Sequence, residues 1–489
     1  MLLLLAVVLA AAPEAAPVLG QEEAVEDESP APSPERLLAM AEKARALVAK
    51  HYGEDVEALA TPVRVVDRAT VIETLQVDLR PNIVLQYGEE NADELTAQNA
   101  ESLGPALLAR YSFVGGEVLI CRENIEATAE YLESPEMLAE GPLRTLLIHE
   151  FVHARDAREV DLAARLGECE DTDGLQALNA VIEGHAQYVT RKIVAEQGWQ
   201  ADFQVFVDSI TKVPASITDP SQRSVIELIV SGFDFAYNDG ERFVAAVAQA
   251  RGPESLSKLF FTPPADPGAV LRPTYYLDPA SRPKIESAIE PALDHFEAVA
   301  VPEAYTRQRV TLIGPQVESI LAGVDPVLVE QALEGLLSTR VLVCQNTERM
   351  GSMVTATLFE FESPGQGLTF LRTLRALLKL RDELYKRGPI RITDADYTEL
   401  RRQGGMKGLM AEKVVESAGG EQEVITVLLL RDSTLVELSA IDDEDDTAKL
   451  IGWSEEVLQV AHGLMEPATA AAADEAPASQ PEEDGAERR

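Results

Sequence analysis

The sequence predicts an α+β protein in which a mainly helical domain with a small sheet precedes an α+β domain with a mostly antiparallel sheet. Its 489 residues exceed what one hydrophobic core usually serves, which favours two domains. Hydrophobic residues make up 46% and charged residues 26%, so a fibrous or wholly disordered chain is excluded. Helical periodicity dominates until about Arg309, and strand-like segments follow. We place the two domains at residues 35–305 and 306–465.

Both ends of the chain are expected to lie outside these domains. Residues 1–20 begin with an apolar run, Met1 to Ala12, which is too short to span a bilayer and is typical of a signal peptide. A signal peptide indicates a secreted or periplasmic protein. An uncleaved N-terminal anchor stays open as the alternative, and no later segment reads as a transmembrane helix. Residues 21–34 and 466–489 are acidic and proline-rich and are expected to be disordered.

The first domain is predicted to begin with a helix over residues 35–50. The later elements are a β-rich stretch from Val63 to Leu75, a helical stretch from Asn91 to Arg110, a strand from Tyr111 to Cys121, two helices between Gly141 and Gln197, and further helices to about residue 300. Gly115 and Gly116 interrupt the strand and indicate a bend or bulge. The two helices are joined by a loop around residues 166–174.

The second domain is predicted to mix helices and strands. After initial helical stretches, its elements are strands at Val341–Cys344 and Met353–Phe361, a long helix at Gln366–Lys386, strands that end in a hairpin around residues 431–433, and a last helix through Trp453 to Leu464. This order is typical of an α+β domain, and no catalytic constellation is recognisable in it.

Charge and cysteine content exclude several classes of partner and scaffold. The net charge of -41 repels nucleic acid and anionic lipid, so neither is an expected partner. Cys121, Cys169 and Cys344 are too few for a disulfide-built fold, which leaves three buried thiols or one bridge between Cys121 and Cys169. A cluster of basic residues on the long C-terminal helix is either a solvated face or a docking patch for an acidic segment, a partner or an anionic surface. Its members are Arg372, Arg375, Lys379 and Arg381.

The segment TLLIHEFVHARDARE, residues 145–159, contains the pattern H-E-x-x-H at His149, Glu150 and His153. On a helix, positions i and i+4 share one face, so both imidazoles can bind one Zn²⁺. Glu150 follows the first histidine and is placed to take a proton from metal-bound water without binding the metal itself. The spacing therefore predicts two metal ligands and a general base.

A catalytic zinc ion usually takes a third protein ligand, and the candidate is Glu183. It lies in QALNAVIEGHAQYV, residues 176–189, which is predicted to be a second helix. His185 points about 200° away from Glu183 on an ideal helix, so we prefer two histidines and Glu183 to three histidines as the ligand set.

The segments IHEFVHARD and NAVIEGHAQYV resemble a largely uncharacterised family of bacterial secreted gluzincin-like zinc metallopeptidases, in which H-E-x-x-H-A is followed by an E-G-x-A helix. Residues 233–244, FDFAYNDGERFV, and 260–277, FFTPPADPGAVLRPTYYL, resemble later segments of that family, so the resemblance covers roughly residues 143–277. It implies a gluzincin-like fold for the first domain. Two departures stand out. The family's Gln-Asp after the second histidine is Asp156-Ala157 here, and its Leu-His-Pro has Arg272 in place of the histidine.

Other candidates could act around this site. His185, Tyr188 and Tyr237 are possible hydrogen-bond donors to the oxyanion that forms when water attacks a carbonyl, with ordinary packing as the alternative. Asp156 lies one turn beyond His153 and either orients an imidazole or is a solvated charge. The strand from Tyr111 to Cys121 is either an edge strand that pairs with an extended substrate or a strand covered on both sides.

These observations predict a secreted zinc-dependent metallopeptidase that hydrolyses peptide bonds in peptide or protein substrates, with Glu150 as general base. The alternative is a catalytically inactive zinc-binding protein of the cell envelope that recruits a partner, because a motif and a fold do not guarantee activity. Neither the preferred substrate nor the oligomeric state follows from the sequence.

Overall fold

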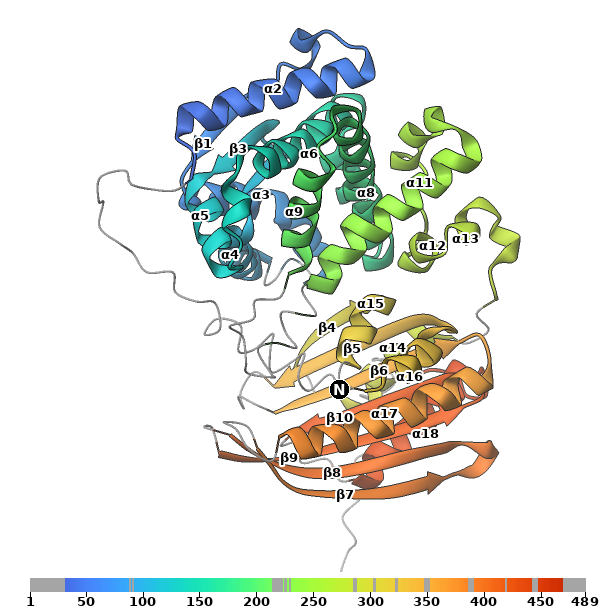
Figure 1. The fold of residues 1–489 in the computed structure, drawn as a ribbon. Coiled ribbons are helices and arrows are strands. Elements are labelled where there is room, and N and C mark those ends of the chain that lie inside the picture. Colours follow the sequence, from blue (N-terminus) through green and yellow to red (C-terminus); the bar gives the residue numbers. More distant parts are fainter. Residues whose placement is uncertain are drawn as a thin grey trace, which may run out of the picture. The chain divides into compact units, whose positions relative to one another are not determined.

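The computed structural model describes residues 31–87, 89, 92–212, 223, 227, 230–284, 288–301, 305–321, 324–346, 352–385, 391–417, 420–441 and 447–468. Their contacts divide the chain into two compact units. As far as they are described, residues 1–283 and 309–322 form the first unit, and residues 284–308 and 323–489 form the second. Helices, a three-stranded sheet and a seven-stranded antiparallel sheet make the protein α+β, as predicted (Figure 1).

Helices dominate the first unit, and side chains of the long helix α8 enter both of its main hydrophobic clusters. The elements of this unit are α2 (Pro34–Tyr52), η1 (Val56–Leu59), β1 (Val63–Val66), α3 (Arg68–Tyr87), α4 (Ala92–Leu103), η2 (Gly104–Ala106), β2 (Ala109–Ser112), β3 (Glu117–Cys121), α5 (Arg122–Tyr131), η3 (Pro135–Leu138), α6 (Glu140–Glu159), α7 (Leu162–Gly167), α8 (Thr172–Gln197), α9 (Gln200–Thr211), the π-helix η4 (Phe235–Asp239), α11 (Gly240–Arg251), η5 (Pro253–Phe260), α12 (Pro267–Leu271), α13 (Pro273–Leu277), η6 (Pro279–Ser281) and α15 (Gly314–Ile320). The predicted pair of helices around the motif is therefore confirmed as α6 and α8.

The β-rich stretch predicted from Val63 to Leu75 is wrong in its second half. It is a strand only as far as Val66, and the helix α3 follows. The Asp67 carboxylate accepts a hydrogen bond from the Thr70 N–H at 2.8 Å, which caps the start of this helix. Val71 and Leu75 are then buried one turn apart, so the β-branched residues of this segment lie in a helix and not in a strand.

The strand predicted from Tyr111 to Cys121 is instead a hairpin. Its two strands, β2 and β3, pair antiparallel, and Gly116 adopts a φ of 66° in the turn between them. β1 pairs parallel with β3, so the sheet order is β1-β3-β2 and β2 is an edge strand of this sheet. The helix predicted to continue to Arg110 ends as α4 at Leu103, before this hairpin begins.

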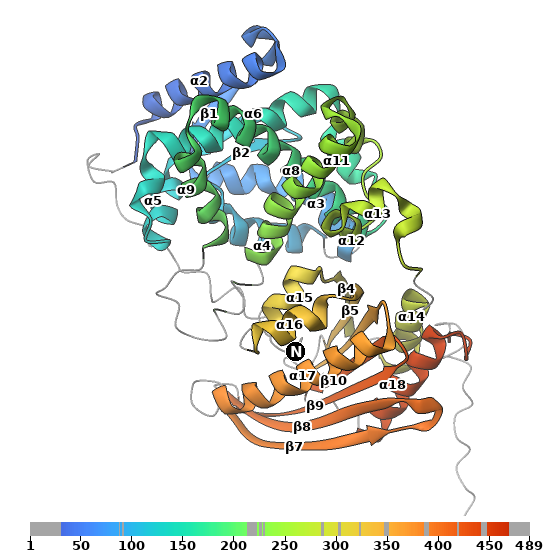
Figure 2. The ribbon, with the colours of Figure 1, turned by 45° about the vertical axis from the view of Figure 1, so that its right-hand side comes forward.

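The second unit is a sheet covered by helices on both faces. Its strand order is β4-β5-β6-β10-β9-β8-β7. One face packs with α14 and α18 in a single hydrophobic cluster, while α17 lies along the other face (Figures 1 and 2). The elements are α14 (Ile289–Ala300), β4 (Tyr305–Thr311), α16 (Pro326–Leu333), β5 (Leu336–Asn346), β6 (Met353–Phe361), α17 (Pro364–Leu384), β7 (Arg391–Arg401), η7 (Gln403–Gly405), β8 (Lys407–Ser417), β9 (Gly420–Arg431), β10 (Thr434–Ile441) and α18 (Thr447–Ala461).

The division between the units differs from the predicted boundary at residues 305 and 306. α14 belongs to the second unit, because Leu293 and Phe296 pack in the core of the large sheet. Residues 309–322 belong to the first unit, where Ile313 packs with side chains of α8 and α11. The chain therefore enters the second unit, returns to the first and enters the second again, which a single boundary cannot represent.

The predicted signal peptide and most of both predicted disordered ends lie outside the described residues. Two short parts of those ends are ordered. Ala31 is buried in the first unit, and the Ala468 N–H donates a hydrogen bond to His295 Nδ1 at 2.9 Å. Of the described helices, none is both long enough and apolar enough to cross a membrane.

All three cysteines are free thiols, so the bridge between Cys121 and Cys169 that the sequence left open is not formed. Cys121 and Cys344 are buried, as expected, whereas Cys169 is partly exposed. The four basic residues on α17 do not form one open patch. Arg375 pairs with Glu399 of β7 at 2.7 Å, and burial lowers the pKa of Arg381.

Candidate metal centre

The motif residues lie on α6 and α8, two long helices with clear local determinants. Every residue from 145 to 154 of α6 is buried, so its histidines lie inside the unit. α8 begins where the Asp171 carboxylate accepts the Gly174 N–H at 2.7 Å, and it ends at Gly198, whose φ of 76° suits a left-handed cap. Burial along its length therefore fixes α6, and caps at both ends fix the bounds of α8. Both helices hold their side chains in defined positions.

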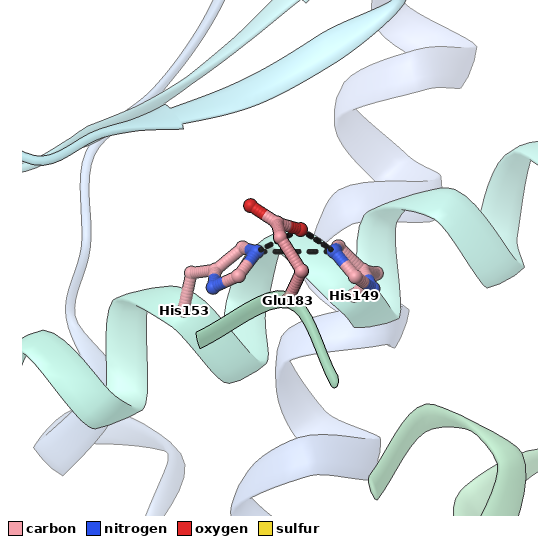
Figure 3. A group of neighbouring side chains, drawn as sticks. All are labelled: His149, His153 and Glu183. Atoms are coloured by element: carbon pink, nitrogen blue, oxygen red, sulfur yellow. Dashed lines mark hydrogen bonds and ion pairs between the residues drawn. The ribbon is translucent and has the colours of Figure 1, made fainter. Parts of the chain in front are cut away.

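His149, His153 and Glu183 converge, as predicted (Figure 3). The Nε2 atoms of the two imidazoles lie 3.0 Å apart. One carboxylate oxygen, Glu183 Oε2, lies 3.1 Å from His149 Nε2 and 3.3 Å from His153 Nε2. The two imidazoles come from successive turns of α6 and the carboxylate from α8. This group could hold a metal ion.

Charges within the group shift two pKa values. Burial alone would lower the pKa of His153, but the Glu183 carboxylate outweighs burial and raises it to about 9. Burial would raise the pKa of Glu183, but His153 and His149 together hold it well below its ordinary value. The group therefore combines an ionised carboxylate with two nitrogen donors that face the same point.

Glu150 lies beside this group but does not join it. Its side chain is buried, and its Oε2 accepts a hydrogen bond from the backbone N–H of Tyr111 at 2.6 Å. Burial raises the pKa of the Glu150 carboxyl, while the neighbouring imidazoles of His149 and His153 oppose that rise. Glu150 is thus separate from the three converging side chains, as the sequence predicted.

The hydrogen-bond donor to Glu150 is a backbone amide on the outer edge of β2, the edge that faces away from β3. The Leu108 and Ser112 carbonyls accept hydrogen bonds from Cys121 and Gly116 on the β3 side. Because alternate residues of a strand face opposite sides, the Tyr111 N–H faces away from β3 and toward α6. Within the predicted segment, β2 is thus an edge strand, whereas β3 lies between β1 and β2. Pairing of this edge with a substrate stays a prediction.

A carboxylate on α3 anchors the same hairpin. Asp78 Oδ1 accepts the Val114 N–H at 3.1 Å, and Asp78 Oδ2 pairs with the Arg110 guanidinium. The side chains of Asp78 and Arg110 are both largely buried, so the pair is shielded from solvent. This anchor holds β2 where the Tyr111 amide reaches Glu150.

Tyr237 lies against the three converging side chains. Its ring stacks on the His149 ring, with centroids 5.3 Å apart and planes at 22°, and its phenol hydrogen-bonds the Glu183 carboxylate. Burial raises the pKa of the phenol, and the charges of Glu183 and Glu150 raise it further, so Tyr237 is a proton donor at neutral pH. It lies in η4, and such π-helical turns often occur at functional sites.

Close packing of two glycines brings Tyr237 to the site. Gly184 follows Glu183, and Gly240 follows the π-helix that carries Tyr237. A Cβ atom on Gly184 would collide with the backbone of Gly240, and one on Gly240 would collide with the carbonyl oxygen of Ala180. Only glycine at both positions lets α8 approach η4 and α11 this closely.

The remaining candidates lie elsewhere. His185 Nδ1 bonds Asp156 Oδ2 at 2.6 Å, and both side chains are buried. Asp156 does orient an imidazole, but it is that of His185 and not that of His149 or His153. Tyr188 packs under the Lys192 ammonium, and the Arg272 guanidinium lies over the Tyr275 ring.

Sequence reasoning missed the aromatic rings and the backbone amide around the group. Phe113 meets the His153 ring edge to face at 5.8 Å, and Phe206 lies 6.1 Å from the His149 ring. Phe113, Phe206 and the Tyr111 amide do not belong to any sequence motif that predicts a metal site. The signals available were the glycine pair Gly115-Gly116 in the β2–β3 turn and the dipeptide Glu183-Gly184, and only the resemblance drew attention to the second.

Comparison with protein-family models, with curated proteins and with solved structures finds no significant match to this chain.

Proposed function

We propose that this protein is a zinc-dependent metallopeptidase of the gluzincin type that hydrolyses peptide bonds, and that residues 1–20 direct it to a secreted or periplasmic location. The observation that carries the proposal is the convergence of His149, His153 and Glu183 beside the separate carboxylate of Glu150. Two imidazoles and one carboxylate are the protein ligands typical of a catalytic zinc ion that keeps a fourth position open.

The separations among the three ligand atoms support zinc. Bonds of about 2.0 to 2.1 Å at tetrahedral angles place neighbouring ligand atoms about 3.3 Å apart. The three separations here are 3.0, 3.1 and 3.3 Å. The side chains therefore fit a tetrahedral ion with little rearrangement. A zinc ion bound there would lower the pKa of its water to about 7 and polarise a substrate carbonyl.

Glu150 has the role of general base in this proposal. Burial raises the pKa of its carboxyl, which brings a carboxylate closer to the pKa that suits proton transfer near neutral pH. The Tyr111 N–H holds Oε2 at 2.6 Å, so the carboxylate has a fixed orientation and its other oxygen is available to the attacking water. Glu150 would take the proton of this water and pass it to the leaving amine.

Two further elements have roles in binding the substrate. β2 is an edge strand of its sheet, and its outer edge would bind an extended peptide as edge strands do, except at the Tyr111 N–H, which Glu150 already occupies. Tyr237 carries a protonated phenol beside Glu183, and it would turn this O–H from Glu183 to the carbonyl oxygen as negative charge develops there.

Turnover of an unfolded protein substrate by wild type and by Glu150→Gln tests the proposal. Wild type should cleave the substrate, and the variant should bind zinc but lose cleavage, because Gln keeps the shape and hydrogen-bonding of the side chain without the base. A wild-type protein that binds zinc but cleaves no substrate would instead favour a zinc-binding envelope protein without activity.

A further inference from the structure

We infer that His185 and Asp156 form a clamp between α8 and α6 that positions the Glu183 carboxylate against the two imidazoles. The inference rests on the proposed zinc site and gives His185 a positioning role, in place of the oxyanion role that the sequence suggested.

The two residues join the helices at the ligand group. Asp156 follows His153 by three residues on α6, and His185 follows Glu183 by two residues on α8. His185 Nδ1 lies 2.6 Å from Asp156 Oδ2, and the two side chains are 6% and 1% exposed. A short hydrogen bond to a carboxylate in a buried setting is strong and directional. It therefore fixes one point of α8 against one point of α6.

A zinc site built from two helices needs such a fixed point. Each residue advances a helix by about 1.5 Å, whereas ligand distances to zinc vary by only about 0.2 Å. A small slide of α8 along α6 would therefore take Glu183 out of reach of an ion held by His149 and His153. A hydrogen bond weakens steeply when its distance or angle changes, so a directional bond between the helices resists such a slide.

The imidazoles themselves have little outer support. Metal-binding histidines usually donate their second ring nitrogen to a carboxylate or a carbonyl. Here the Nδ1 atoms of His149 and His153 are buried, and neither has a hydrogen-bond partner among the described residues. The position of the ligands then depends on the two helix backbones and on what joins them.

One aromatic ring and one guanidinium flank the clamp. The His185 ring meets the buried Phe260 ring edge to face, with centroids 5.3 Å apart. On the other side, Arg155 Nη1 lies 3.6 Å from the second Asp156 oxygen, Oδ1. Asp156 Oδ1 has no hydrogen-bond partner among the described residues, so Oδ2 makes the bond that joins the helices. The pair is too deeply buried to contact a peptide substrate.

The experiment measures zinc affinity by chelator competition, together with kcat and KM, for His185→Ala and His185→Asn. The amide nitrogen of Asn can take the place of Nδ1 and donate to Asp156. Val247→Ala is the matched control, because it removes buried side-chain volume from the same unit without touching the clamp.

We expect His185→Ala to weaken zinc affinity at least tenfold, as loss of an outer support usually does, and to lower kcat with KM within about twofold. His185→Asn should restore zinc affinity to within about threefold of wild type. Val247→Ala should lower the melting temperature and leave zinc affinity within about twofold.

Wild-type zinc affinity in His185→Ala would overturn the inference, as would equal losses in His185→Ala and Val247→Ala. Should His185→Ala fail to fold, Asp156→Asn decides by the same zinc measurement, with weaker binding in support and wild-type binding against. Failure of the wild-type protein to bind zinc would overturn the proposed function as well, so the two failures are distinguishable.

Discussion

Gly184 and Gly240 touch backbone to backbone beside the candidate metal centre, and this contact places Tyr237 next to Glu183. Gly184→Ala should therefore separate η4 and α11 from α8. We expect a loss of about 1 to 3 kcal/mol in the free energy of unfolding, as for other overpacked sites, and a lower kcat because Tyr237 moves away. Urea unfolding and peptide hydrolysis measure the two effects.

Gly452→Ala is the matched control for this substitution. Gly452 lies inside α18, and a Cβ atom there meets nothing within 4 Å. Alanine should raise the free energy of unfolding by about 0.4 to 1 kcal/mol, because it favours the helix and restricts the unfolded chain. Equal effects of Gly184→Ala and Gly452→Ala would show that the close contact between α8 and α11 has no special importance.

Tyr237→Phe keeps the ring that stacks on His149 and removes only the phenol. The variant should lose a donor to the developing oxyanion, and kcat should fall on the order of 100-fold, as it does when such donors are removed from other enzymes. Zinc affinity should change far less, because Phe leaves the three ligands in place. Steady-state kinetics together with a zinc titration checks this, and an unchanged kcat would remove Tyr237 from the mechanism.

His51 makes stability depend on pH. Burial lowers the pKa of His51 below its ordinary value near 6.5, and Glu196, 3.6 Å away, compensates only in part. The unfolded chain therefore binds the proton more readily than the folded chain does, and stability is lost as pH falls below about 6.5 through the folded pKa. Between pH 7.5 and 5, wild type should lose more free energy of unfolding than His51→Gln, in urea unfolding at both values. Equal losses would show that His51 does not contribute.

The sequence predicts which three side chains converge because the determinants are local. Two histidines four residues apart on a helix must share a face, and Glu183 follows on the next long helix, so His149, His153 and Glu183 could be named in advance. The Tyr111 amide could not, since a backbone group carries no residue signature and its role depends on where the hairpin packs against α6.

Local propensity misled where tertiary context decided the outcome. The β-branched residues after Val66 favour a strand, but the Asp67 cap and the buried spacing of Val71 and Leu75 make a helix. His185 likewise could be placed on a helix face from the sequence, but its partner Asp156 comes from a different helix. The hydrophobic periodicity of one helix does not identify which residues of another helix it contacts.

The position of a bound zinc ion tests the central claim most directly. Crystals grown with zinc and measured at its absorption edge should show one anomalous peak about 2.0 to 2.2 Å from His149 Nε2, His153 Nε2 and a Glu183 oxygen. A peak that lacks the Glu183 carboxylate as a ligand, or no peak at these three side chains, would contradict the account.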